Sequence, residues 1–204
     1  LTIVFGVGSG VLMAVQKDRM LDHVLGTFST VALSVPGFWI AIVLIFIFAE
    51  QWKILPSSGI SDGSGFILPA ITLALPSIGV CARLTRSAIL DEIGRQYMTV
   101  ADAKGMSRRR AVIRHAFGNA LIPIITYLGN HMAGIIGGAS IVETIFAIPG
   151  IGSYAIAGVQ SKDYYVVQAY VLFSGCIYVL TNILIDLIYI ALDPKIRAGE
   201  AVES

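Results

Sequence analysis

The stretch 24–49 contains no charged side chain over 26 consecutive residues. A helix needs roughly 20 apolar residues to cross the hydrocarbon core of a bilayer, so this stretch predicts a membrane span. Three further stretches are similarly apolar and predict spans at 66–82, 121–142 and 166–192. The run 1–15 is expected to be the end of another span, because the sequence opens inside apolar residues rather than with Met and a basic segment. The predicted fold is an all-α, polytopic transmembrane bundle over 1–204 that lacks its N-terminal span.

Composition supports a membrane protein and excludes several other classes. Charged residues make up 13% of the chain, whereas a soluble domain carries about 25%. A net charge of +1, without aromatic residues among the arginines, gives no nucleic-acid platform. Cys81 and Cys176 lie in apolar stretches without the spacing of metal ligands, so neither a disulfide framework nor a metal site is predicted.

The basic residues predict the orientation of the spans. Lys and Arg accumulate in short cytoplasmic loops of membrane proteins. Only Lys53 and Lys162 fall in the loops around 50–65 and 143–165, which are therefore expected to lie outside. The other twelve of the fourteen fall in the first loop, the third loop and the C-terminal tail: Lys17, Arg19, Arg83, Arg86, Arg95, Lys104, Arg108, Arg109, Arg110, Arg114, Lys195 and Arg197. The loop 83–118 and the C-terminus are expected to be cytoplasmic.

The cytoplasmic loop 83–118 has a helical pattern of its own. Apolar residues recur every four positions, at Ile89, Ile93, Tyr97 and Ala101. Gly105 tolerates a left-handed turn, and Ser107 is a suitable N-cap for a second helix. The pattern predicts a helix, a glycine turn and a short basic amphipathic helix. The arginine run 108–110 is also typical of an anchor at the cytoplasmic membrane face, and the two roles are compatible.

Three motifs carry a resemblance to a known family. The stretches 97–107 and 114–123 resemble the cytoplasmic EAA signature of ATP-binding-cassette importer permeases, in the form found in dipeptide, oligopeptide and nickel permeases. The stretches 141–152 and 182–197 are similar to the same subfamily. The chain departs from the name of the signature, because Glu-Ala-Ala reads Thr99-Val100-Ala101. This subfamily commonly has Thr at the first of these places.

The resemblance implies a type I importer permease fold in a bacterial or archaeal inner membrane. It implies that the loop docks on a separate ATPase subunit through a set of small and basic residues: Thr99, Ala101, Ala103, Lys104, Gly105, Met106, Arg108, Arg109 and Arg110. The sequence contains no G-x-x-x-x-G-K-[ST] phosphate loop, so no cofactor is expected on this chain and ATP hydrolysis would occur on the partner. The further implied partners are a second permease subunit, expected to be a paralogue of this one, an extracytoplasmic substrate-binding protein and the surrounding membrane lipid.

Several assignments stay open at the level of the sequence. Peptides are the favoured cargo, nickel complexes the alternative, and a membrane enzyme using Glu143, Asp163 or the histidines a more distant one. Asn130, His131 and Asn182 are candidates to line the pathway, although polar residues in spans more often bond neighbouring helices. Gly134 and Gly138 form a G-x-x-x-G pattern, interpreted as packing within one subunit rather than a seam between subunits.

Overall fold

The computed structural model describes residues 1–60, 63–95, 116–137 and 139–192, and these residues form helices joined by turns and loops. The all-α fold predicted from the sequence is confirmed. The elements, in chain order, are η1 (Thr2–Val7), α1 (Gly8–Val15), α2 (Met20–Ser34), α3 (Gly37–Leu44), η2 (Ile45–Gln51), η3 (Gly63–Phe66), α4 (Ile67–Ile93), α7 (Phe117–Ile136), α8 (Ser140–Ile145), α9 (Ile151–Gln160) and α10 (Tyr164–Leu192).

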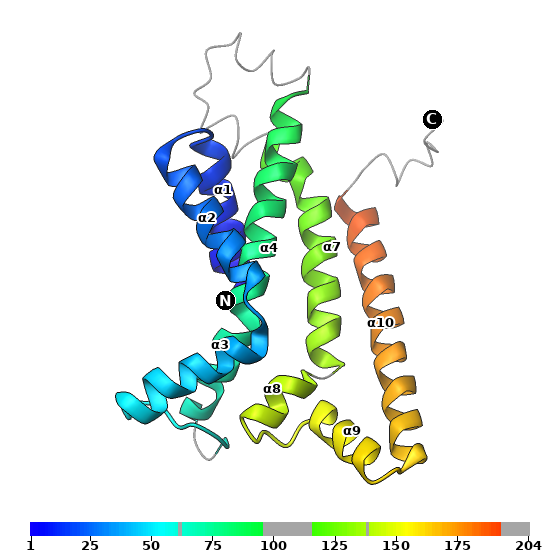
Figure 1. Cartoon of the computed structure of the whole chain (residues 1–204). Helices are drawn as coiled ribbons and strands as arrows, with labels where there is room; N and C mark the ends of the chain where they lie inside the picture. Colours follow the sequence, from blue (N-terminus) through cyan, green and yellow to red (C-terminus); the bar gives the residue numbers. More distant parts are fainter. Residues whose placement is uncertain (61–62, 96–115, 138, 193–204) are drawn as a thin grey trace.

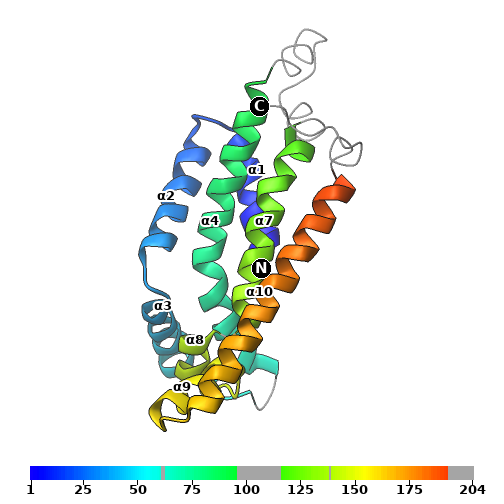
Figure 2. The same cartoon turned by 90° about the vertical axis from the view of Figure 1, so that its right-hand side faces the viewer.

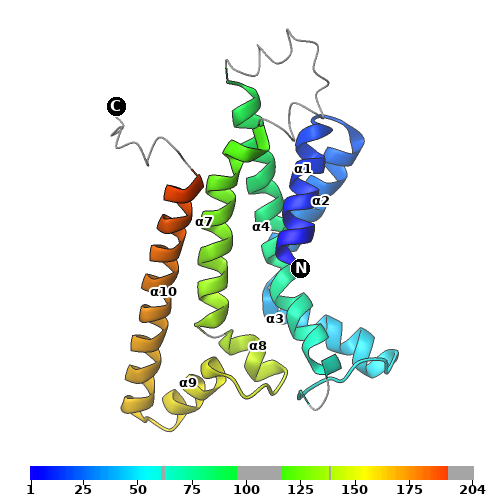
Figure 3. The same cartoon turned by 180° about the vertical axis from the view of Figure 1, so that it is seen from behind.

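Helix α4 lies at the centre of the bundle. Helices α1 and α2 pack on one side of it, and α7 and then α10 follow on the other side (Figure 1). Helices α3, α8 and α9 gather at one end, where they run across the direction of the long helices (Figure 3). The turn between α1 and α2, the end of α4 and the start of α7 lie at the opposite end, which we call the basic end because Lys17, Arg19 and Arg95 are there (Figure 2).

Two helices within the described residues are long and apolar enough to cross a membrane by themselves, at Gly63–Ile93 and Tyr164–Ile188. A third candidate span is broken, because α2 and the α3–η2 helix pass the same test together but are bent by 99°. Pro36 lies at the break in an extended conformation, with φ −61° and ψ 138°. Proline lacks the amide hydrogen that a continuous helix would need and disfavours a helical residue before it, which accounts for the break.

The observed helices differ from the expected spans in three places. The stretch 24–49 was expected to be one span and is instead a sharply bent pair. The span at 66–82 continues without a break into the start of the expected loop helix, since α4 runs on to Ile93 despite Pro76 in its interior. The rest of that loop helix lies outside the described residues. The stretch 121–142 is divided, because α7 ends at Ile136 and α8 starts at Ser140.

Small residues let the helices of the first half approach closely. A Cβ atom added to Gly10 of α1 would lie 2.6 Å from the carbonyl oxygen of Ala82 and 2.5 Å from Cβ of Thr85, both on α4. A contact of that length is not tolerated between real side chains, so the α1–α4 crossing requires a glycine here. Nearby, Ala14, Ile89, Ala120 and two further apolar residues form a fully buried cluster between α1, α4 and α7.

Helix α10 is held much more loosely. Only 6% of its most apolar window is buried within the chain. Its described contact with α7 centres on Ile185, which is 5% exposed and packs where a Cβ at Gly129 would stand. A long apolar helix that the chain itself leaves open requires cover from lipid or from another protein.

Candidate functional site

The coupling residues expected from the sequence lie outside the described residues. Thr99, Ala101, Ala103, Lys104, Gly105, Met106, Arg108, Arg109 and Arg110 all fall within 96–115. Their role therefore stays a prediction. The two helices that carry this loop are described as far as Arg95 on one side and from Ala116 on the other.

A polar cluster joins these two helices where the loop departs. Asn119 of α7 donates from Nδ2 to Oε2 of Glu92 on α4 at 3.2 Å. Arg95 approaches the other oxygen of the same carboxylate at 2.9 Å from its Nε. Glu92 is 9% exposed, so its charge needs such partners. The cluster fixes the end of α4 to the start of α7, and hence fixes the spacing of the two points from which the loop leaves the bundle.

A cavity of about 440 Å³ lies between α4, α7 and α10. Its walls combine aromatic, amide, imidazole and small apolar side chains, contributed by Leu73, Tyr127, Asn130, His131, Gly134, Ile135, Ala139 and Tyr178. A volume of a few hundred cubic ångströms with a few polar groups is typical of a small-molecule site. The cavity is therefore a candidate segment of a passage along the bundle.

Hydrogen bonds to α4 fix two of the cavity residues. Tyr127 donates its hydroxyl hydrogen to the carbonyl oxygen of Ser77 at 3.2 Å, and His131 Nδ1 lies 3.4 Å from the Ser77 hydroxyl oxygen. The rings of Tyr127 and His131, one helical turn apart, are parallel within 1° with their centroids 6.0 Å apart. Nε2 of His131 is buried and has no hydrogen-bond partner among the described residues. An imidazole held in this way retains one nitrogen for a further ligand or water.

The structure brings together two of the three residues proposed for the pathway. Asn130 and His131 line the same cavity, whereas Asn182 of α10 is exposed and is not part of its wall. Tyr127 and Tyr178 were not singled out from the sequence. The sequence did contain one indication of their role: each lies one helical turn before a candidate pathway residue, Tyr127 before His131 and Tyr178 before Asn182. Spacing in the sequence does not show which face of α7 meets which face of α10. The structure was therefore needed to place Tyr127 and Tyr178 in the same cavity wall.

The carboxylates considered for an enzyme serve the backbone instead. Glu143 accepts the amide hydrogens of Ser153 at 2.7 Å and Ala139 at 3.1 Å. Asp163 accepts those of Tyr165 and Val166 in the first turn of α10. These are helix-capping contacts, which satisfy amides that a helix start leaves free. Within the described residues no group of three or more His, Cys, Asp or Glu side chains could hold a metal. Glu143 and Asp163 are therefore engaged in capping the starts of α8, α9 and α10.

Gly150 is required by the Glu143 contact. An added Cβ at Gly150 would collide with the carboxylate carbon and with Oε2 of Glu143. The Glu143 carboxylate thus occupies the space beside Gly150 that any side chain there would fill, and from this position it links α8 to the first turn of α9. The sequence identified the stretch 141–152 as a motif, and the structure gives it a physical reason, namely a carboxylate clasp between two short helices at the end opposite the basic end.

The interpretation of the G-x-x-x-G pattern is corrected for Gly134. A Cβ added there would meet nothing within 4 Å, and the residue is exposed on the cavity side of α7. Gly134 is therefore not a packing position against any described residue, and Gly138 lies outside the described part of the chain. The close contacts of α7 with α10 occur one to two turns away, at Gly129.

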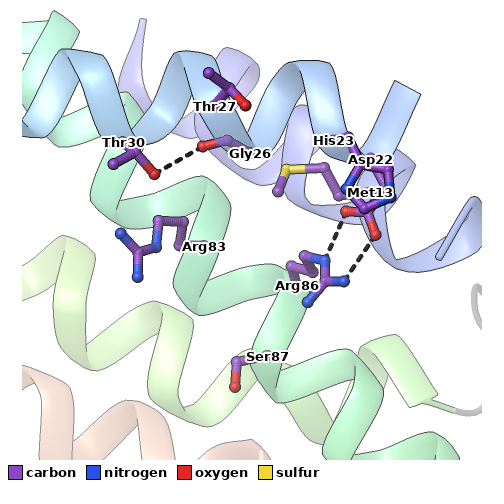
Figure 4. A pocket seen from close by; sticks show the side chains of 9 residues that line it. All are labelled: Met13, Asp22, His23, Gly26, Thr27, Thr30, Arg83, Arg86 and Ser87. Atoms are coloured by element: carbon purple, nitrogen blue, oxygen red, sulfur yellow. Dashed lines mark hydrogen bonds and ion pairs between the residues drawn. The ribbon is translucent and has the colours of Figure 1, made fainter. Parts of the chain in front are cut away.

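A second cavity, of about 580 Å³, lies between α2 and α4 toward the basic end. Arg86 of α4 and Asp22 of α2 form an ion pair in its wall (Figure 4). Arg83, one turn earlier on α4, faces the same cavity. Sequence reasoning assigned both arginines only to the orientation of the spans.

Comparison with known proteins gives a family and a fold. Residues 6–198 match the family described as "Binding-protein-dependent transport system inner membrane component". The chain is 39% identical over 205 residues to the probable peptide ABC transporter permease protein y4tP of Sinorhizobium fredii, covering 97% of this chain and 66% of that protein. It is 34% identical over 195 residues to the glutathione transport system permease protein GsiC of Escherichia coli K12, covering 96% of this chain and 64% of that protein.

The chain thus spans about two thirds of the length of these relatives. Among solved structures, a chain in the structure titled "Inward facing conformations of the MetNI methionine ABC transporter" is similar, with a TM-score of 0.74 and 17% sequence identity. The similarity covers 94% of this chain and 88% of the other. At that identity the likeness establishes the fold alone, and it agrees with the type I importer permease fold expected from the sequence.

Proposed function

The chain belongs to the family of binding-protein-dependent transport system inner membrane components, and we propose that it is a permease subunit of an ATP-driven importer. The family is one of transport components rather than enzymes. The observation that best supports the proposal is a bundle of apolar helices with a partly polar cavity between α4, α7 and α10. This cavity holds the His131 nitrogen that has no hydrogen-bond partner among the described residues. A polar cavity inside a membrane bundle is costly and is typical of a passage for solutes.

We propose peptides as the cargo. The two relatives described above carry names that refer to peptide and glutathione transport. Amide, hydroxyl and imidazole groups beside tyrosine rings suit a neutral peptide backbone, which needs both hydrogen-bond partners and apolar contact. Nickel complexes stay the alternative, for which the described cavity offers a single imidazole and no thiolate or carboxylate.

The partners are proposed from the family. They are two ATPase subunits, a second permease subunit that is a paralogue of this one, and an extracytoplasmic binding protein that delivers the cargo. The exposed helix α10 leaves room for the second permease subunit or for lipid. The Glu92–Asn119 cluster would transmit displacement of the loop 96–115 to α4 and α7 together, because it ties both helix ends to one buried carboxylate.

The proposed orientation places the basic end in the cytoplasm and α8–α9 outside, in an inner membrane. Single cysteines test it in a chain whose native Cys81 and Cys176 are replaced by serine. Ser58→Cys and Ser161→Cys lie at the α8–α9 end and are exposed, so an impermeant thiol reagent should label both in intact cells. Ser107→Cys should be labelled only after the membrane is opened. Labelling of position 107 in intact cells would reverse the orientation.

Reconstitution of the complete importer tests the function. The permease pair, the ATPase subunits and the binding protein are placed in lipid vesicles, and ATP hydrolysis and peptide uptake are followed. Loaded binding protein outside should raise hydrolysis inside, which is a coupling between two separate sites. Uptake driven by an ion gradient, without ATPase subunits, would contradict the importer and favour a secondary transporter.

Two variants probe the proposed coupling loop in that system. Gly105→Val adds bulk and restricts the backbone where a turn is predicted, so ATPase subunits should co-purify poorly with it. Reversing the charge of Arg108, Arg109 and Arg110 together should weaken the same contact, with membrane insertion measured separately. Wild-type co-purification and uptake in both variants would remove this segment from the coupling role.

A further inference from the structure

The cavity between α2 and α4 is lined by side chains of two kinds. The charged or titratable side chains are those of Asp22, His23, Arg83 and Arg86, and the hydroxyl side chains are those of Thr27, Thr30 and Ser87 (Figure 4). Met13 and Gly26 complete the lining. This cavity is separate from the one around His131, since the two share no lining residue. The transport proposal does not use it.

One of the two arginines in this cavity is already neutralised. Arg86 donates from Nε to Oδ1 and from Nη2 to Oδ2 of Asp22, each at 2.7 Å. Asp22 also accepts the amide hydrogen of Asp18 at 3.0 Å and is 4% exposed. Three donor hydrogens therefore engage this carboxylate, and Arg86 balances its charge.

Arg83 is the second cation and has no ion-pair partner among the described residues. In Figure 4 its guanidinium lies below Thr30, on the side away from Asp22. The hydroxyls of Thr27 and Ser87 make no hydrogen bond within the described part of the chain, while Thr30 donates to the carbonyl of Gly26. Among the described residues the cavity thus presents one guanidinium without an ion pair and two hydroxyls without a hydrogen bond, all on exposed residues at its open side. Together these donors can hold an oxyanion.

We propose that this cavity binds the headgroup phosphate of an anionic phospholipid from the cytoplasmic leaflet. A planar guanidinium donates to phosphate oxygens in pairs, and basic pockets between transmembrane helices on the cytoplasmic side accept such headgroups. The proposal rests on the orientation given above, which places the basic end at the cytoplasmic surface. Val24, Phe28 and Val31 on the outer face of α2 are each more than half exposed and provide an apolar surface for the acyl chains.

Native mass spectrometry of the purified complex tests the proposal without requiring transport. The complex is exchanged into micelles containing equal amounts of phosphatidylglycerol and phosphatidylcholine, and retained lipid is counted. The wild type should retain phosphatidylglycerol preferentially. Arg83→Gln should lower that occupancy about fivefold, the effect expected for one arginine at a membrane surface. Arg83→Lys keeps the charge and should retain an intermediate amount.

Arg19→Gln is the matched control. Arg19 is also exposed and lies at the basic end, at the N-cap of α2, but it does not line the cavity. It should therefore leave the bound lipid unchanged. Equal losses in both arginine variants, or equal retention of both lipids by the wild type, would overturn the proposal in favour of a general surface charge effect.

Free phosphate distinguishes the source of the anion. Inorganic phosphate at millimolar concentration should not displace the lipid, because it lacks the acyl chains that contact α2. Displacement by phosphate would show a site for a soluble anion and overturn the lipid assignment. Lipid retention is measured independently of uptake and hydrolysis. A protein that transports peptide but shows no lipid preference would contradict only the lipid proposal. A protein that prefers the anionic lipid but does not transport would contradict only the proposed function.

Discussion

Arg86 of α4 reaches Asp22 of α2 with two parallel hydrogen bonds of 2.7 Å, and this pair joins residues separated by 64 positions in the sequence. The carboxylate is 4% exposed and the guanidinium 30%. Because Asp22 is so well covered, its charge depends on this partner. The pair fixes the distance between α2 and α4 near the basic end. It lies on the basic-end side of the break at Pro36, after which α3 and η2 bend away from α2 by 99°.

Removing one partner of this pair should destabilise the bundle. Asp22→Asn leaves Arg86 without its counter-ion and should cost about 2 kcal/mol, less than a fully buried pair because Arg86 is partly solvated. That cost corresponds to roughly 5 °C in melting temperature for a chain of this size. Thermal unfolding of the purified protein in detergent provides the measurement. Asp91→Asn, an exposed carboxylate on α4, is the control and should change little.

The double variant Asp22→Asn with Arg86→Gln separates the pair from its members. Removing both charges leaves no buried charge without a partner. The double variant should therefore lose less stability than the sum of the losses in the two single variants. Losses that simply add would show that the two side chains act independently.

The Glu143 clasp predicts a severe effect of Gly150→Ala. The new methyl group would collide with the carboxylate that holds the first turn of α9, so the α8–α9 segment should lose its fixed arrangement. Limited proteolysis from the external side should cut this segment faster than in the wild type. Gly175→Ala on α10 adds the same methyl group where no described residue lies within 4 Å, and its cleavage pattern should be unchanged. Wild-type protease resistance in Gly150→Ala would contradict the clasp.

The cavity between α4, α7 and α10 predicts a difference between two polar residues. His131→Ala removes from the cavity wall an imidazole whose Nε2 has no hydrogen-bond partner among the described residues. Peptide uptake should fall about tenfold, the equivalent of about 1.4 kcal/mol in a lost hydrogen bond to cargo. Asn182→Ala changes a residue outside that wall and should transport normally. Uptake by reconstituted importer measures both. Equal loss in both variants would move the pathway toward α10, and no loss in either would exclude His131.

The Glu92–Asn119 contact predicts a defect in communication between sites. Asn119→Ala leaves the buried carboxylate with fewer donors and loosens α7 from the end of α4. The ratio of ATP hydrolysis with loaded binding protein to hydrolysis without it should therefore fall. Asn119→Asp, which places a second carboxylate against Glu92, should lower the ratio further because like charges repel. A ratio equal to that of the wild type in both variants would exclude the contact from coupling.

The sequence by itself determined the class of the protein and the number of apolar stretches. Uncharged runs of about 20 residues leave few alternatives to helices in a membrane, because lipid offers no partner for open backbone groups. The bend between α2 and α3 was also encoded locally, in Pro36, although the length of the uncharged run concealed it. The family resemblance followed from ordered local motifs, and the match over residues 6–198 supports it.

Only the tertiary structure decided which side chains meet. The pairs Asp22 with Arg86, Glu92 with Asn119 and Ser77 with His131 each join residues 27 or more positions apart. Helical spacing gives the face on which a residue lies but not the rotation of one helix against the next, which depends on close crossings such as Gly10 against Ala82 and Thr85. The rotation of α10 against α7 likewise decides that Asn182 lies outside the cavity wall that contains Asn130 and His131. Their polarity was visible in the sequence, and their distance was fixed by how α10 packs on α7.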